Sequence, residues 1–90
     1  MHGEQPAGAD EQAVIDGVKG EVEGKVGRAL AVYEAKSASK QVVAGTNYFV
    51  KVHVGEGNYI HVRIWRKLDG GLVLSNVLEG KTESDPLEYF

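Results

Sequence analysis

The stretch YFVKVHVGEGNYIHVRIW, residues 48–65, decides the fold class of this 90-residue chain. Apolar residues occupy every second position on both sides of GEGN (residues 55–58), and this alternation is typical of two β-strands joined by a turn. Both apolar sets lie on one face only if the strands pair in a suitable register. We therefore predict an antiparallel hairpin with the following cross-strand pairs: Val54–Ile60, Val52–Val62, Val50–Ile64 and His53–His61.

A single amphipathic helix is predicted upstream of this hairpin, between residues 13 and 30. Apolar residues recur there at intervals of three or four, which places them on one side of a helix. Four glycines fall on the opposite side, where we expect them to face water, and each lowers helix stability by about 0.5–1 kcal/mol. The apolar positions are Ile15, Val18, Val22, Val26 and Ala29, and the glycines are Gly17, Gly20, Gly24 and Gly27.

The rest of the chain predicts further strands. Residues 31–40 have weak strand character, and Asp69-Gly70-Gly71 is a turn signal before an apolar strand over residues 72–77. The last four residues, 87–90, have strand composition and are expected to add an edge strand. The predicted fold is α+β, with one helix packed across an antiparallel sheet of four or five strands. Residues 1–10 are predicted to form a flexible arm, and residues 11–90 a single domain.

Composition excludes several classes of function. The net charge is −3, so there is no basic field to attract nucleic acid or an anionic membrane. The absence of cysteine removes disulfides and a thiol nucleophile, and residues 1–13 lack the features of a secretion signal, so we expect a cytoplasmic protein. His53 and His61 supply only half of a tetrahedral metal shell, and no serine is placed beside them. We therefore predict no metal site, no cofactor and no enzymatic activity.

One apolar segment lies where a connection between strands is due. It consists of Gln41, Val42, Val43, Ala44 and Gly45. Composition alone favours a continuing strand through Val42 and Val43, because a turn made of these residues has no side-chain reason to face water. If the segment is instead a turn, its small apolar side chains and exposed backbone suit the filling of a narrow apolar groove.

This segment and the TNYFVKV that follows it, residues 46–52, resemble the first-loop signature of the cystatins, and specifically of the stefins, or type 1 cystatins. The resemblance continues through HVG (residues 53–55), HVR (61–63), LVLSN (72–76) and LEYF (87–90), so that it covers most of residues 12–90. The lack of cysteine suits the stefins better than the secreted, disulfide-bonded type 2 cystatins.

The resemblance implies a sheet wrapped around one helix, and reversible, competitive, tight-binding inhibition of papain-like cysteine proteases of the cathepsin L, S, H and B types. We expect a monomer. Because its glycines make the helix unusual for the family and suggest low stability, we also expect that the arm, the helix and the adjoining strand can be exchanged between two copies through the first loop, which gives a swapped dimer. The alternative is a non-inhibitory cystatin-fold interaction or scaffold protein. By position, the protease-binding residues are Gly3 (or Gly8) in the arm, Gln41, Val42, Val43, Ala44 and Gly45 in the first loop, and Leu68, Asp69 and Gly70 in the second. Val43→Asp or Gly45→Trp is expected to weaken binding strongly while leaving the fold intact.

Overall fold

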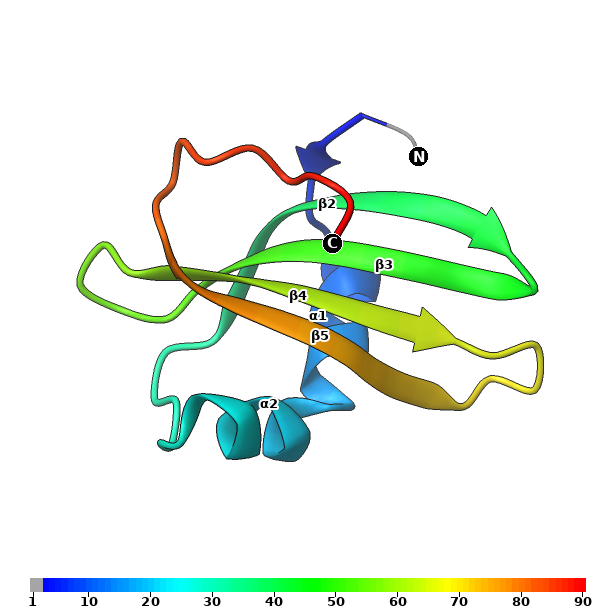
Figure 1. Ribbon diagram of the computed structural model, residues 1–90, viewed down its shortest axis with the longest axis horizontal. Coiled ribbons are helices and arrows are strands. Elements are labelled where there is room, and N and C mark those ends of the chain that lie inside the picture. The colour runs from blue at the N-terminus through cyan, green and yellow to red at the C-terminus, as the bar shows by residue number, and fades with distance from the viewer. Residues whose placement is uncertain (1–2) are drawn as a thin grey trace.

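Alternating apolar residues build the centre of an antiparallel sheet in the computed structural model, which describes residues 3–90 (Figure 1). The strands lie in sequence order across the sheet, and two helices cover one of its faces. The predicted α+β fold is confirmed. The elements are β1 (Gln5–Pro6), α1 (Ala9–Asp16), α2 (Lys19–Val26), β2 (Glu34–Val43), β3 (Gly45–His53), β4 (Tyr59–Arg66) and β5 (Leu72–Lys81).

The hydrophobic core lies between the helices and the two central strands. Every second residue of β3 and β4 points toward the helices, as the alternating pattern predicts, and burial of these side chains is the main favourable contribution to folding. The fully or almost fully buried core residues are Val14, Ile15, Val18 and Val22 on the helical side, and Val50, Val52, Ile60, Val62 and Ile64 on the sheet.

The predicted β3–β4 hairpin is confirmed, but its predicted register is wrong by two residues. A three-residue turn, Gly55-Glu56-Gly57, has positive φ angles of 102°, 53° and 73°, so the strands pair closer to the turn than expected. A shift of two residues leaves each side chain on its original face, and hydrophobic patterning therefore does not detect it. The observed pairs include Val52–Ile60, Val50–Val62, Tyr48–Ile64, His53–Tyr59 and Lys51–His61.

The predicted single helix is present as two short helices that meet at Gly17 and Val18. A Cβ atom on Gly17 would lie 2.6 Å from Leu72 Cδ1, so Gly17 allows the helical segment to approach the first residue of β5. Gly17 is nevertheless exposed, as the pattern predicts. Open space surrounds the Cβ positions of Gly20, Gly24 and Gly27, in agreement with the prediction for these three. Gly27 ends α2 in the left-handed conformation, with a φ of 76°.

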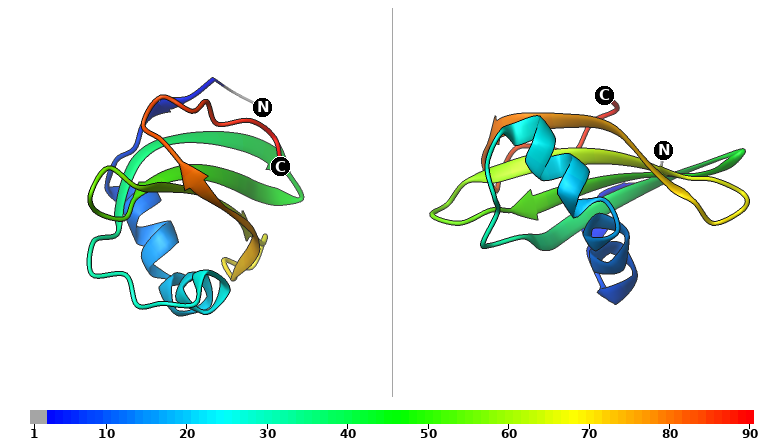
Figure 2. Two further views of the ribbon diagram at one scale, coloured as in Figure 1. Left: turned by 60° about the vertical axis from the view of Figure 1, so that its left-hand side comes forward. Right: turned by 90° about the horizontal axis from the view of Figure 1, so that it is seen from below.

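The C-terminal segment, residues 82–90, crosses the face of the sheet opposite the helices (Figure 2). The predicted edge strand at residues 87–90 is wrong, because none of these residues pairs with a strand. The rings of Tyr89 and Phe90 each lie 5.6 Å from the ring of Phe49, and Arg63 Nη1 donates a hydrogen bond of 2.8 Å to the Phe90 carbonyl. The segment thereby covers the second apolar face of the strands instead of extending the sheet.

His61 lies beneath this segment and is only 1% exposed. The C-terminal segment covers this side of the sheet, and the ring of Phe90 lies 6.3 Å from the imidazole. Burial, assisted by the nearby ammonium groups of Lys51 and Lys81, lowers the pKa of His61 to about 4. Its Nε2 atom has no hydrogen-bond partner among residues 3–90. The folded protein therefore favours the neutral imidazole.

We expect acid to destabilise the protein through His61. The unfolded chain binds a proton at this imidazole near pH 6.5, whereas the folded chain does so only near pH 4, so stability falls as the pH decreases between these values. The expected loss between pH 7.5 and pH 5 is about 2 kcal/mol of unfolding free energy. Urea titrations at both pH values measure it. His61→Gln should show a smaller difference than His53→Gln, the control for losing an imidazole. Equal pH dependence in wild type and His61→Gln would contradict the assignment.

Candidate functional site

Two hairpin tips lie side by side at one end of the sheet, the right-hand end in Figure 1. Antiparallel strands in sequence order place the β2–β3 and β4–β5 connections at one end and the β3–β4 connection at the other. The view from below in Figure 2 shows the same two tips projecting beyond the helices. The topology thus brings residues 41–45 close to residues 68–70, although they are far apart in the sequence.

The first tip, residues 41–45, is a narrow hairpin in which only Ala44 lies outside the strands. Val43 pairs with Gly45 and Val42 pairs with Thr46, so β2 does continue through both valines, as composition favoured. The valines are nevertheless exposed, Val42 by 78% and Val43 by 43%. The two interpretations of this segment are therefore compatible, because a strand that projects beyond the core exposes its side chains.

Trp65, on β4, stabilises the first tip. Its indole Nε1–H donates a hydrogen bond of 2.8 Å to the Ala44 carbonyl oxygen. Gly45, with a φ of 98°, lies so close to β4 that a Cβ atom would be 2.1 Å from the Arg66 carbonyl oxygen. The expectation that a Gly45 substitution leaves the fold intact is wrong for this reason. Sequence analysis missed the role of Trp65, since its partner Ala44 is twenty-one residues away.

The second tip is a tight turn over residues 67–71. Lys67 N–H donates a hydrogen bond of 2.8 Å to the Gly71 carbonyl, and Gly70 has a φ of 90°. The carboxylate of Asp69 accepts a hydrogen bond of 2.9 Å from Gly71 N–H, which ties it to the turn backbone. Leu68 is 84% exposed, so this tip also presents an apolar side chain to solvent.

Gly3 lies beside β2, just before β1. Because β1 is antiparallel to β2, its N-terminal end is the end nearer the first tip, and Gly3 borders a groove together with Ser39 and Lys40. Gly8 is instead the N-cap residue of α1, and its N–H donates a hydrogen bond of 2.7 Å to Glu11 Oε1. Of the two glycines considered for the arm, Gly3 is the one next to the tip-bearing strand.

The predicted arm, residues 1–10, is partly included in the regular structure. It contains all of β1 and the first two residues of α1. Met1 and His2 lie outside the described residues. Within residues 3–90, no three His, Asp or Glu side chains gather as a metal-binding group. No helix in this part of the chain is long and apolar enough to cross a membrane.

Comparison with known proteins agrees with this arrangement. A model of the cystatin domain matches residues 5–82. Cystatin-B of Oplegnathus fasciatus is 43% identical over 90 residues, which cover 94% of this chain and 90% of that protein. Cystatin-B of Paralichthys olivaceus is 44% identical (96% and 93% covered), and that of Homo sapiens is 43% identical (96% and 91% covered). The chain therefore belongs to the cystatin family, as a stefin-like, type 1 cystatin.

Proposed function

We propose that this protein is a reversible, competitive, tight-binding inhibitor of papain-like cysteine proteases, including those of the cathepsin L, S, H and B types, and not an enzyme. The observation that carries the proposal is the pair of adjacent tips that expose Val42, Val43 and Leu68 at one end of a rigid sheet. Membership of the cystatin family supports inhibition of cysteine proteases as the activity. The arm around Gly3 lies next to β2, toward the first tip, and together with the two tips it forms a wedge that occludes the active-site cleft.

The proposed mechanism is steric occlusion. The tips enter the active-site cleft on both sides of the catalytic thiolate, and their apolar side chains replace water in the groove. Burial of about 200 Å² of apolar surface would contribute roughly 5 kcal/mol before ordering costs are subtracted. Those costs are low, because strand pairing and the Trp65–Ala44 hydrogen bond hold the first tip in one conformation before binding. The protease loses its activity because its cleft is blocked, and it does not have to cleave the inhibitor.

The test is a titration of active papain, and then of a cathepsin L-type enzyme, with the monomeric protein. Hydrolysis of a small fluorogenic substrate is followed after any dimer has been removed by gel filtration. We expect stoichiometric, competitive loss of activity that is restored on dilution. A folded monomer that leaves both enzymes active would overturn the proposal and favour the alternative, a non-inhibitory interaction or scaffold protein with the cystatin fold.

We further propose that the inhibitor acts as a cytoplasmic monomer. Its lack of cysteine fits a reducing compartment. A swapped dimer would form by opening the β2–β3 hairpin, which has Ala44 as its sole residue between strands. Because the exposed valines would then lie in one long strand between two copies, such a dimer is expected not to inhibit. Gel filtration combined with the papain titration separates the two species.

A further inference from the structure

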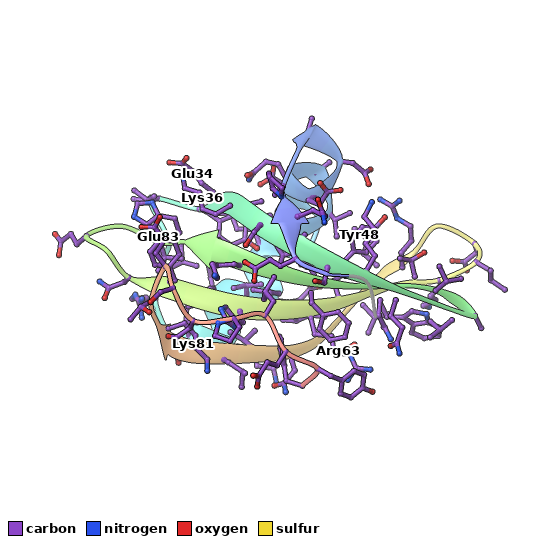
Figure 3. The ribbon with its side chains drawn as sticks, turned by 90° about the horizontal axis from the view of Figure 1, so that it is seen from above. Glu34, Lys36, Tyr48, Arg63, Lys81 and Glu83 are labelled. Atoms are coloured by element: carbon purple, nitrogen blue, oxygen red, sulfur yellow. The ribbon has the colours of Figure 1, made fainter. Side chains whose placement is uncertain are left out.

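A buried lysine lies at the centre of the sheet face that the C-terminal segment covers. The side chain of Lys51 is only 6% exposed, and its Nζ atom lies 3.1 Å from Glu4 Oε2. The same Nζ donates a hydrogen bond of 2.7 Å to the carbonyl oxygen of Glu83. Figure 3 shows Glu83 on the C-terminal segment as it passes over this face. A buried ammonium group requires such partners, because removing it from water without them is strongly unfavourable.

Glu4 joins this lysine to two further segments of the chain. Its carboxylate accepts hydrogen bonds from the Ser37 hydroxyl on β2 and, over 3.2 Å, from the backbone N–H of Leu87. Partial burial disfavours the charged form of Glu4, but the contacts with Ser37, Leu87 and Lys51 outweigh it, so the pKa of Glu4 lies below its ordinary value. One carboxylate thus connects the N-terminal arm to β2, β3 and the C-terminal segment.

Backbone pairing holds the arm only weakly at this point. β1 has two residues, and one of them, Pro6, has no N–H to donate. A further hydrogen bond of 3.0 Å joins Ala7 N–H to the Lys36 carbonyl. The Glu4 carboxylate is therefore a principal attachment of the arm, and it is immediately adjacent to Gly3.

We infer that Glu4 is a positioning residue, which through Lys51, Ser37 and Leu87 holds Gly3 against β2 on the side of the first tip before a protease is met. The inference rests on the proposed function and adds to it a residue outside the three protease-binding segments. An arm that is already ordered loses less conformational entropy on binding than a free arm. The polar partners of Glu4 among the described residues, Ser37, Lys51 and Leu87, belong to neither tip.

The test compares Glu4→Gln with Glu88→Gln, a matched change at an exposed residue of the C-terminal segment. We expect the inhibition constant for papain to rise about 10-fold in Glu4→Gln, mainly through faster dissociation, and to stay unchanged in Glu88→Gln. A variant lacking residues 1–3 provides the second background. There Glu4→Gln should have no effect, because the segment that it positions has been removed. If Glu4→Gln weakens inhibition equally in the full-length protein and in the variant lacking residues 1–3, its effect is general destabilisation, and the inference is overturned.

Hydrogen exchange of the free inhibitor, with no protease present, gives a readout that does not depend on inhibition. The amides of Ala7 and Leu87 should exchange faster in Glu4→Gln, whereas the amide of Val50 in the core should be unchanged. Unchanged exchange at Ala7, or a wild-type inhibition constant in Glu4→Gln, would overturn the positioning role. Failure of the proposed function has a different signature, because wild type would then not inhibit while the exchange difference remained.

Discussion

Gly45→Ala is expected to lose about 2–4 kcal/mol of unfolding free energy, together with most of its protease inhibition. The backbone at Gly45 has a φ of 98°, which disfavours any residue with a Cβ atom. That Cβ atom would also lie 2.1 Å from the Arg66 carbonyl oxygen, so β3 and β4 would have to separate at the tip. This separation of the strands would also break the Trp65–Ala44 hydrogen bond.

Gly57→Ala is the matched control for this variant. Gly57 also has a positive φ, 73°, but nothing lies within 4 Å of its Cβ position, and it is in the β3–β4 turn at the other end of the sheet. Gly57→Ala should lower the free energy of unfolding by about 1 kcal/mol and leave inhibition unchanged. Urea unfolding followed by circular dichroism measures stability, and papain titration measures inhibition, which we expect to weaken more than about 100-fold in Gly45→Ala. Equal stability of the two variants would contradict the steric argument.

Val42→Asp is expected to abolish most inhibition without affecting the fold. Val42 is 78% exposed, so the folded protein gains little from its side chain, and the free energy of unfolding should change by less than about 0.5 kcal/mol. In the proposed complex the same position is buried in an apolar groove, where a carboxylate is costly to desolvate. The inhibition constant should rise about 100-fold, which corresponds to about 2.7 kcal/mol of binding free energy.

Ala31→Asp introduces the same charge at an exposed position beside the β3–β4 turn, far from the tips, and should inhibit like wild type. Val43 is the less suitable residue for this test, because it is only 43% exposed and its replacement combines effects on folding and on binding. Papain titration of the two Asp variants at equal monomer concentration makes the comparison. If Val42→Asp inhibits as strongly as Ala31→Asp, the first tip is not the main contact.

The candidate site was largely accessible to sequence analysis because its residues are consecutive. Gln41, Val42 and Val43 carry a family signature, and glycines in the second connection mark its turn. What patterning did not reveal is how the tips are supported. The indole of Trp65 bonds to a backbone atom, and Glu4 bonds to Lys51 across 47 positions of the chain, and neither contact leaves a periodic signal.

The observed fold differs from the predicted one at three places where local patterning is also uninformative. The predicted β3–β4 register is wrong by two residues, because a shift of two residues leaves the alternating pattern of apolar side chains unchanged. The helix is divided at Gly17, where Leu72 approaches, and residues 87–90 cover Phe49 although their composition is typical of a strand. In the last two cases a contact between distant segments decided between conformations that the local sequence allowed, whereas the three-residue turn sets the register.

The residues alone predict the α+β class, the face of β3 and β4 that is buried, the turn positions and the apolar first tip. These features depend on residue type and on spacing along the chain, and both can be read directly. The tertiary structure alone decided the pairing register, the division of the helix, the burial of His61 and Lys51 beneath the C-terminal segment, and the attachment of the arm by Glu4. These depend on which distant atoms meet, because desolvation and hydrogen bonding act through space and not along the chain.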